Sequence, residues 1–404
     1  MQTNITQTFL NTPQGQEAET ILRSCVHCGF CTATCPTYQL TGNELDSPRG
    51  RIYLIKEMLE GQQASERTQY HLDRCLTCRS CETTCPSGVQ YGRLVEIGRE
   101  IAEQQVARPL SQTLIRQLLR SVIPYPKRFS IMLRLGHLFK PLLPKQLSKK
   151  LPTLQEKKQF IPTTHPRTVV ALTGCVQPLL APSTNAAAAQ LLDKLGVTLV
   201  EAPQSGCCGA MSYHTGGHED GLDFARRNID AWWPFVESGA EAVLNTASGC
   251  GAFVKEYGEL LIHDVQYAAK AKRVSELAKD LCELLAPDDL RPFYKSELPA
   301  IAFQNPCSLQ HGQKITGKIE ALLISLGYTL TDVPESHLCC GSAGSYSVLQ
   351  PEMSQSLLER KLTALNSGSP ALIVSANIGC QLHLSTQSEI PIKHWIEVVA
   401  EAIN

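Results

Sequence analysis

The sequence contains no hydrophobic run long enough to cross a membrane, because it has no stretch of about 18 consecutive apolar residues. Its first 20 residues have neither a basic start nor an apolar core, so we expect no secretory signal peptide. An excess of either charge is also absent, since 37 Lys and Arg stand against 38 Asp and Glu. This balance excludes a globally basic nucleic-acid-binding protein and an acidic tail protein.

The fingerprints of nucleotide-containing cofactors are missing as well. Neither G-x-G-x-x-G nor G-x-x-x-x-G-K-[ST] occurs in the 404 residues. We therefore expect no flavin, nicotinamide or nucleotide on this chain, and we expect a partner to carry any two-electron cofactor. The composition, 43% hydrophobic and 19% charged, is that of a globular protein of several domains.

Cysteine, by contrast, is abundant, with 17 residues. A disulfide framework is not expected in a chain without a secretory signal, because reducing compartments keep thiols free. An odd total also fits metal ligation better than complete pairing. All but one of these cysteines fall into two repeated patterns.

The first pattern, C-x2-C-x2-C-x3-C-P, occurs twice in the first quarter of the chain. Its cysteines are Cys25, Cys28, Cys31 and Cys35 in the first run and Cys75, Cys78, Cys81 and Cys85 in the second. The spacing is typical of [4Fe–4S] ligands, and in two-cluster ferredoxins the fourth cysteine ligates the other cluster. Structural zinc, the alternative, is typical of two C-x2-C pairs farther apart. We therefore predict two ligand sets: a first set of Cys25, Cys28, Cys31 and Cys85, and a second set of Cys75, Cys78, Cys81 and Cys35.

The segment between the two runs is predicted to be helical over residues 48–61, which begin with Pro48 and end with Gly61. Its apolar residues recur at helical spacing, at Ile52, Leu54, Ile55, Met58 and Leu59. Together with the two runs, this segment resembles the helical ferredoxin domain of succinate-dehydrogenase-like iron–sulfur subunits. The resemblance implies an electron relay rather than a catalytic site.

The two runs differ at one position that bears on redox chemistry, since Arg79 stands where the first run has Gly29. A cation about 10 Å from a cluster contributes ~1–2 kcal/mol toward its reduced form at an effective dielectric of about 20. We hypothesise that Arg79 gives the cluster of the second set the higher potential. The alternative is a solvated Arg79 side chain that points away.

The second pattern is a duplication in the C-terminal half. Cys175, Cys207, Cys208 and Cys250 recur as Cys307, Cys339, Cys340 and Cys380, at offsets of 132, 132, 132 and 130 residues. In each copy, strand-like segments alternate with helical segments, which predicts βαβ units and a mostly parallel sheet. An apolar run ends at Cys175 and a strand is expected to end at Cys250, and Pro234 is expected to bend or interrupt a helix over 223–239. The cysteines thus follow strand carboxyl ends, where open α/β sheets bind ligands.

The adjacent cysteines of each copy are poorly suited to a disulfide. Their Cα atoms lie about 3.8 Å apart, whereas disulfides need about 4.4–6.8 Å, so the pair suits metal binding. Gly209 and Gly341 remove a side chain where the backbone must pass close to the site. The pattern resembles the cysteine-rich CCG domains of heterodisulfide reductase, which have a fifth cysteine per repeat. A third iron–sulfur cluster, zinc and free thiols at a docking surface therefore stay open for these eight cysteines.

Other residues near the motifs carry weaker signals. Cys282, the seventeenth cysteine, lies on the apolar face of a predicted helix and is expected to be a buried structural thiol. Five histidines lie near cysteine motifs, where each is a ligand, a proton relay or an ordinary hydrogen-bonded residue: His27, His214, His311, His337 and His383.

Residues 107–166 have a one-sided charge, with 12 Lys or Arg and a single acidic residue, Glu156. Prolines divide this segment into short pieces, and residues 129–143 combine an apolar stripe with cationic flanks. Such a stretch suits an anionic membrane surface or an acidic partner subunit. A basic linker solvated on its own domain is the alternative.

The chain as a whole resembles the iron–sulfur subunits of bacterial glycolate oxidase (glycolate dehydrogenase). The resemblance is carried by both cysteine runs and by SPRGRIYLIKEMLEG, NIDAWWP, TASGCGAFVKEYG, TDVPESHLCCGSAGSYS and KHWIEVV. It implies a multidomain α+β protein with four parts: a mainly helical two-cluster ferredoxin domain (1–106), a basic Pro-rich linker (107–166), and two repeated α/β CCG domains (167–297 and 298–404).

The same resemblance implies an electron-transfer subunit with two [4Fe–4S] clusters and no catalytic residue of its own. Two FAD-domain subunits would oxidise glycolate to glyoxylate, and this chain would pass the electrons to a membrane acceptor, expected to be a quinone. We expect it in the cytoplasm, peripheral to the inner membrane through 107–166. Subunits of lactate or glycerol-3-phosphate dehydrogenase complexes share the layout. A disulfide-cleaving reductase and a zinc-stabilised scaffold are the alternatives from other functional classes.

Overall fold

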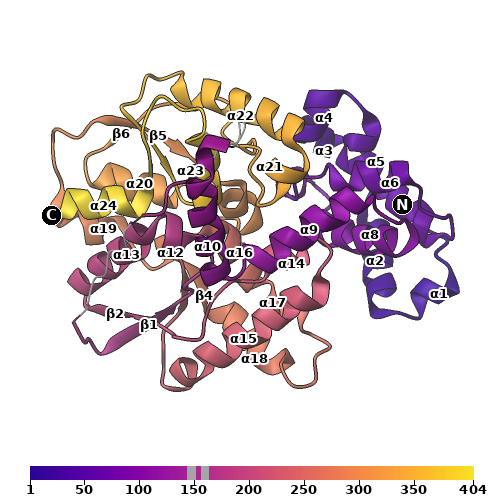
Figure 1. The fold of residues 1–404 in the computed structure, drawn as a ribbon, viewed down its shortest axis with the longest axis horizontal. Coiled ribbons are helices and arrows are strands. Elements are labelled where there is room, and N and C mark those ends of the chain that lie inside the picture. Colours follow the sequence, from indigo (N-terminus) through magenta and orange to yellow (C-terminus); the bar gives the residue numbers. More distant parts are fainter. Residues whose placement is uncertain (143–151, 156–162) are drawn as a thin grey trace.

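The computed structural model describes residues 1–142, 152–155 and 163–404, and the two chain ends lie far apart along its longest axis (Figure 1). The N-terminal helices form one body, and two four-stranded parallel sheets with their helices form the rest. This is the multidomain α+β architecture that the sequence predicts.

The helical body carries both cysteine runs. Its helices are α1 (Gln7–Leu10), α2 (Pro13–Ser24), α3 (Phe30–Ala33), α4 (Pro36–Thr41), α5 (Pro48–Leu59), α6 (Glu66–Asp73), α7 (Ser80–Thr84) and α8 (Tyr91–Gln105), with a 3₁₀ turn, η1 (Glu44–Asp46). Helix α5 confirms the helix predicted over 48–61. It begins where it does because Ser47 Oγ accepts the Gly50 amide at 2.9 Å and Pro48 occupies the first helical position.

Helices α5 and α8 form the core of this body. Leu94 and Ile55 are fully buried between them. Gly98 allows the close approach, because a Cβ at that position would lie only 2.5 Å from Ile55 Cγ1. The cysteine loops are therefore attached to a rigid pair of helices.

Two helices lead from this body toward the sheets: α9 (Leu110–Val122) and α10 (Pro126–Leu138), followed by a 3₁₀ turn, η2 (Lys140–Leu142) (Figure 1). Pro109 and Pro126 stand at the two helix starts, so these prolines begin helices rather than break them. The remainder of the basic segment, residues 143–151 and 156–162, lies outside the described residues.

The first repeat is a parallel sheet in the order β2-β1-β3-β4, in which Val169 pairs with Leu199 and Val170 with Val243. Its strands are β1 (Arg167–Ala171), β2 (Val197–Glu201), β3 (Val243–Asn245) and β4 (Ala278–Asp280). Its helices are α12 (Gln177–Leu180), α13 (Pro182–Lys194), α14 (Ala210–Tyr213), α15 (His218–Glu237), α16 (Ser248–Lys255), α17 (Tyr257–Leu260), α18 (Ala268–Leu277) and α19 (Pro287–Leu290), with 3₁₀ turns η3 (Leu281–Glu283) and η4 (Arg291–Phe293).

The second repeat has the same topology, with strand order β6-β5-β7-β8 and Phe303 paired with Val374. Its strands are β5 (Ala300–Gln304), β6 (Thr329–Leu330), β7 (Leu372–Ser375) and β8 (Ile392–His394). Its helices are a π-helical turn, η5 (Ser308–Gly312), and α20 (Lys318–Ser325), α21 (Tyr346–Leu349), α22 (Pro351–Asn366), α23 (Ile378–Leu384) and α24 (Trp395–Ile403).

The two repeats share one hydrophobic core. Leu191 and Leu192 of α13 belong to the same buried cluster as Trp395 and Val399 of α24, and the two helices pack against each other. Polar contacts join the repeats too, since His394 Nε2 lies 2.9 Å from the Thr246 carbonyl oxygen. The duplication therefore forms a single body.

Three local predictions are wrong. Cys250 and its counterpart Cys380 lie on helices α16 and α23, because the strands before them end at Asn245 and Ser375. Cys282 is buried as predicted, but it lies in the turn η3 after strand β4 rather than on a helix. Helix α15 continues past Pro234 to Glu237, so the proline does not interrupt it.

Candidate metal centres

Four cysteines of the first set lie around a hollow at the surface of the helical body. The hollow has about 440 Å³ of empty space, part of it open to solvent. Cys25, Cys28, Cys31 and Cys85 line it, with Cys81 beside them. Cys28 is exposed, and the neighbouring Val26 and Phe30 side chains are 67% and 60% exposed. The first set thus opens to the outside of the molecule.

Each thiol of this set makes it harder for its neighbours to ionise, because neighbouring thiolates would repel one another. Burial, with the neighbouring Cys25, Cys35 and Cys28, raises the pKa of Cys31 to about 11. A thiolate is the form that ligates metal. Thiolates this close together need a positive core to offset their repulsion, and bound iron supplies that charge by displacing the protons.

Cys35 acts electrostatically on cysteines of both sets. Burial raises the pKa of Cys81, and Cys78, Cys75 and Cys35 act on it in the same direction. Cys35 acts on Cys31 of the first set as well. Cys35 does not line the hollow of the first set, although Cys81 does.

Hydrogen-bonding groups surround the second set. Tyr91 Oη donates toward Cys75 Sγ at 3.6 Å, and Thr37 Oγ1 lies 3.3 Å from Cys35 Sγ. The Thr37 hydroxyl itself donates to the Asp46 carbonyl oxygen at 2.7 Å. Hydrogen bonds near the sulfurs are one of the means by which a protein sets a cluster's potential.

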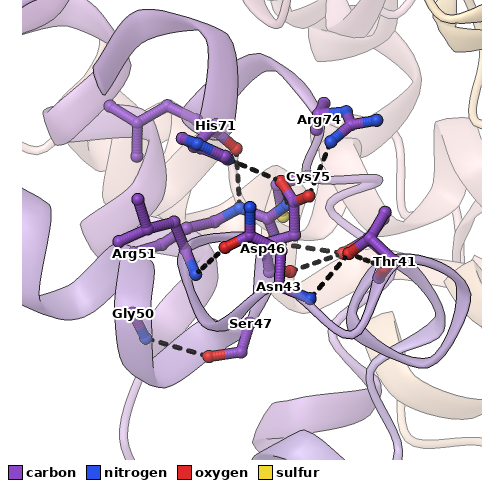
Figure 2. A network of polar contacts seen from close by, with 12 residues as sticks. Thr41, Asn43, Asp46, Ser47, Gly50, Arg51, His71, Arg74 and Cys75 are labelled. Carbon is purple, nitrogen blue, oxygen red and sulfur yellow. Dashed lines mark hydrogen bonds and ion pairs between the residues drawn. The ribbon is translucent and has the colours of Figure 1, made fainter. Parts of the chain in front are cut away.

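A buried ionic network lies directly behind the second set (Figure 2). The Asp46 carboxylate, with no exposure, accepts from Arg74 Nη1 at 2.6 Å and from His71 Nδ1 at 2.9 Å. Arg51, only 1% exposed, donates from Nε to the His71 carbonyl oxygen at 2.7 Å and from Nη1 to Thr37 Oγ1 at 3.1 Å. Its Nη2 lies 3.5 Å from Asp46 Oδ1.

Several buried polar atoms beside the cysteine loops have no hydrogen-bond partner among the described residues. They include Arg51 Nη2, Ser80 Oγ and His27 Nε2. An unsatisfied buried donor costs about 1–3 kcal/mol, so native structures rarely leave one without a reason. Anionic sulfur at both cysteine sets would satisfy these donors, and the residues therefore fit two iron–sulfur clusters.

Arg79, to which the sequence hypothesis gave the redox role, faces carboxylates. It forms an ion pair with Glu256 of the first repeat, and Glu82 acts on it as well. Its side chain is only 19% exposed, so the solvated alternative does not describe it either. Two carboxylates therefore oppose this one cation.

The eight cysteines of the repeats form two matching rows of thiols, in the order Cys175, Cys207, Cys208, Cys250 and Cys307, Cys339, Cys340, Cys380. Neighbours in each row hydrogen-bond, and Cys307 Sγ lies 3.8 Å from Cys339 Sγ. Lys361 is buried beside the second row, where it donates to the Ser336 carbonyl oxygen at 2.9 Å. Burial lowers the pKa of Lys361, and the thiols of Cys340 and Cys339 oppose that shift.

Glycine is required after each adjacent pair. Gly209 and Gly341 have φ of +99° and +88°, and a Cβ would lie 2.4 Å from the Gly221 carbonyl oxygen and 2.5 Å from that of Ser354. Both the backbone conformation and the close approach therefore exclude other residues. The close approach is to a helix backbone, α15 for Gly209 and α22 for Gly341, whereas the sequence prediction placed it at the cysteine site.

The second set lies against the second repeat. Leu76, Cys339 and Tyr346 form one buried cluster, and Cys78 and Cys307 pack against it. Tyr346 Oη donates to the Arg74 carbonyl oxygen at 2.9 Å. Burial raises the pKa of Cys78, and Cys307 is its largest electrostatic neighbour. The second row of thiols, which begins at Cys307, thus lies directly beside Cys78 of the second set.

The first repeat instead contacts helix α8. His214 Nδ1 lies 3.3 Å from Glu96 Oε1, and His218 Nδ1 lies 3.2 Å from Glu100 Oε2. Arg93 Nη1 donates to Tyr213 Oη at 3.3 Å. The first repeat thus contacts the helical body through α8 and, at Glu256, through Arg79 of the second cysteine run.

Most of the histidines singled out by the sequence have protein partners. His311 Nδ1 lies 2.8 Å from Thr83 Oγ1 and its Nε2 lies 3.0 Å from the His337 carbonyl oxygen. His383 Nε2 lies 3.1 Å from Ser354 Oγ. His214 pairs with Glu96, as above. His27 Nε2 is buried and has no hydrogen-bond partner among the described residues.

In the described part of the chain, no three Cys, His or acidic side chains stand at the spacing of a single metal ion. A helix with both the length and the apolar character to cross a bilayer is likewise absent from the described residues.

Comparison with known proteins places these features in a family. Residues 21–89 match the 4Fe-4S dicluster domain, and residues 169–255 and 301–385 each match the cysteine-rich domain. The glycolate oxidase iron–sulfur subunit of Escherichia coli is 54% identical over 404 residues, covering 100% of this chain and 99% of that one. The chain belongs to the family of glycolate oxidase iron–sulfur subunits.

More distant similarities extend beyond this family. A probable glycolate oxidase iron–sulfur subunit of Bacillus subtilis is 32% identical, covering 90% of this chain and 88% of that protein. One subunit of the dihydromethanophenazine:CoB–CoM heterodisulfide reductase of Methanosarcina mazei is 24% identical, over 95% of this chain and 94% of its own length. A crystal structure of a hypothetical protein from Helicobacter pylori shares the fold, with a TM-score of 0.59 and 11% identity over 99% of this chain and 73% of that one.

The sequence missed the polar surroundings of the second set. Asp46, Arg51 and His71 have no motif of their own, and each resembles an ordinary surface residue of a helix in the sequence. The only available signal was charge on the otherwise apolar face of the helix predicted over 48–61, where Arg51 stands beside Ile52 and Ile55.

Proposed function

We propose that this chain is the electron-transferring subunit of a complex that oxidises glycolate to glyoxylate. The flavin would reside on separate FAD-domain subunits, and the electrons would leave to a membrane acceptor of the quinone class. The full-length similarity to the glycolate oxidase iron–sulfur subunit of E. coli carries the proposal. The cysteine sets described above support it, and so does the absence of a dinucleotide fingerprint in the sequence.

The proposed ligands are crossed between the two runs. Cys25, Cys28, Cys31 and Cys85 would hold one [4Fe–4S] cluster, and Cys75, Cys78, Cys81 and Cys35 the other. When bound, such clusters supply one-electron carriage, which a flavin's two-electron chemistry needs in order to reach a one-electron chain. The place of Cys85 at the hollow and of Cys35 beside Cys81 supports this assignment.

The surroundings of each set indicate its task. Cys28 and the apolar Val26 and Phe30 face outward, so the first set is accessible to a redox partner. The second set lies against the second repeat, because Leu76 of the helical body and Tyr346 of the repeat belong to one buried cluster. The two rows of repeat thiols are proposed as a candidate further centre, with iron–sulfur or zinc as its metal.

Metal content is the first test. We would purify the full chain anaerobically, count iron and zinc, and record EPR spectra on reduction. Two clusters require about eight iron atoms per chain. Appreciably more iron, with a third signal that Cys208→Ser abolishes, would place a further centre in the repeats. Zinc without iron would contradict the proposal.

Activity of the assembled complex is the second test. Cys78→Ser is expected to reduce glycolate-dependent dye reduction sharply, because it removes a ligand of the second set. Cys282→Ser is the matched control, since Cys282 is buried and belongs to neither pattern, and it should keep full activity. Full activity of Cys78→Ser would end the electron-relay proposal.

Helix α9 supports the proposed membrane contact through 107–166. Its single buried residue is Arg116, which pairs with Asp73 at 3.1 Å. Its leucines point outward, with Leu110, Leu114 and Leu118 exposed by 82%, 64% and 53%. Residues 110–142 contain six Lys or Arg and no acidic residue. An outward apolar face in a segment whose own charged residues are all basic suits an anionic lipid surface.

Vesicle co-sedimentation tests this contact with the full chain. Binding to vesicles containing phosphatidylglycerol should fall by roughly 100-fold in a Leu114→Glu, Leu118→Glu variant, because each buried Leu contributes about 1.5–3 kcal/mol. Ile262→Glu, on an equally exposed residue of the first repeat, is the control. Equal losses in the two variants, or none, would contradict the membrane contact.

A further inference from the structure

Arg51 brings a guanidinium group into the interior at the second set. It lies on α5, and its side chain is 1% exposed. Through Nη1 it reaches Thr37 Oγ1 at 3.1 Å, and that hydroxyl lies 3.3 Å from Cys35 Sγ. Cys75 and Cys35 both act on Arg51 electrostatically. The cation therefore lies between two ligands of one set.

One nitrogen of this group has no hydrogen-bond partner. Nη2 is buried and makes no hydrogen bond with a described residue, although Asp46 Oδ1 lies 3.5 Å away. A buried guanidinium normally uses its whole fork of donors. An unused donor beside two ligand cysteines fits an anionic acceptor at the second set.

The charges around Arg51 leave a net positive sum. Asp46 is the carboxylate of the network, and it serves both Arg51 and Arg74, with His71 donating to it as well (Figure 2). Arg99 also approaches, donating from Nη2 to the Cys75 carbonyl oxygen at 2.6 Å, but Glu96 balances it. Two guanidinium groups thus share one carboxylate next to the second set.

Arg79 has the opposite balance. Two carboxylates, Glu256 and Glu82, act on this single cation. At a comparable place in the chain, next to Cys78, it therefore contributes little net positive charge. Arg79, which the sequence suggests, is thus balanced by carboxylates, whereas Arg51, which tertiary packing buries, is not.

We propose that the buried Arg51 cation raises the reduction potential of the second-set cluster, which Cys75, Cys78, Cys81 and Cys35 would hold. Reduction adds one negative charge to the cluster, and a buried cation stabilises that charge more than water-exposed groups do. The electron then resides preferentially on the inner set rather than on the exposed first set. This inference rests on the proposed ligand assignment.

The test is an EPR-monitored redox titration of the full chain with its clusters. Arg51→Gln should move the midpoint of the second-set signal to lower potential and leave that of the first set unchanged. One unit charge at about 10 Å and an effective dielectric of about 20 corresponds to a roughly tenfold shift in the distribution of one electron between the two sets. Arg51→Lys, which keeps the charge, should restore most of the potential.

Matched variants separate charge from structure. Asp46→Asn removes the opposing carboxylate, so it should move the same midpoint to higher potential, the reverse of Arg51→Gln. Arg79→Gln should have the smaller effect. A structural role alone would not give opposite signs for Arg51→Gln and Asp46→Asn.

Clear outcomes overturn the inference. An Arg51→Gln chain with wild-type iron content and an unchanged second-set midpoint would do so, as would an equal or larger shift in Arg79→Gln. If Arg51→Gln does not retain iron, the Asp46→Asn variant is the test instead. A second-set midpoint potential that does not rise in Asp46→Asn would then refute the inference. If the wild-type chain holds two clusters and the variants leave the second-set midpoint potential unchanged, only this inference is refuted. If the wild-type chain holds no iron, the proposed function is refuted.

Discussion

Acidification is expected to weaken the joint between the two repeats through His394. Its ring is fully buried, Nε2 donates to the Thr246 carbonyl oxygen at 2.9 Å, and Nδ1 accepts the Ile396 amide at 3.3 Å. A second proton on Nδ1 would face that amide proton. Burial lowers the pKa of His394 to about 4 from 6.5, although Glu397 opposes the shift.

The magnitude follows from the difference between the folded and unfolded pKa. The unfolded chain binds a proton below about pH 6.5, and the folded chain only below about pH 4, so this contribution is complete above pH 6.5 and is lost as the pH falls. At pH 5 the free energy of unfolding should be lower by ~2 kcal/mol, from about 1.4 kcal/mol per pH unit. That corresponds to a melting temperature lower by roughly 4–8 °C for a body of this size.

Melting temperatures at pH 8 and pH 5 measure this effect in the full chain. His394→Asn keeps a helix-capping side chain but cannot titrate, so it should melt below the wild type at pH 8. At pH 5 the difference in melting temperature between the wild type and His394→Asn should be smaller by roughly 4–8 °C. His263→Asn, at an exposed histidine, should show no such change. A gap for His394→Asn that is the same at both pH values would refute the reasoning.

Two further substitutions test the packing of the second repeat. Gly341→Ala should lower the melting temperature well beyond Gly196→Ala, because both have positive φ but only the former places a Cβ 2.5 Å from a carbonyl oxygen of α22; equal effects would contradict this. Tyr346→Phe should cost about 1 kcal/mol by removing the bond to the Arg74 carbonyl oxygen, whereas Tyr294→Phe, at an exposed ring, should be neutral in the same melting assay.

The sequence predicted what depends on spacing along the chain. The cysteine runs and the duplicated thiols follow from fixed offsets, and helix α5 follows from an apolar period with a proline start. Strands β4 (Ala278–Asp280) and β8 (Ile392–His394) were not predicted, because each is short and contains charged or polar side chains in place of the apolar run that indicates a buried strand. Cys250 was placed at a strand end, whereas β3 ends at Asn245 and α16 begins at Ser248.

The charged surroundings of the second set could not be predicted from spacing. Arg79 stands next to Cys78 in sequence, yet it is paired with Glu256 from a different domain. Arg51 is distant from Cys75 in sequence, yet it is buried against that residue because α5 and α6 pack together. Such contacts are set by tertiary packing, for which one sequence contains no periodic signal.

The shared core of the repeats has a consequence for biosynthesis. Because Trp395 and Val399 of α24 complete the core around α13, the first repeat buries its core fully only when α24 has packed against it. The core of the helical body contains no residue of the repeats. During synthesis we therefore expect the helical body to fold first, and the cover over the second set, to which Cys339 and Tyr346 contribute, to form afterwards.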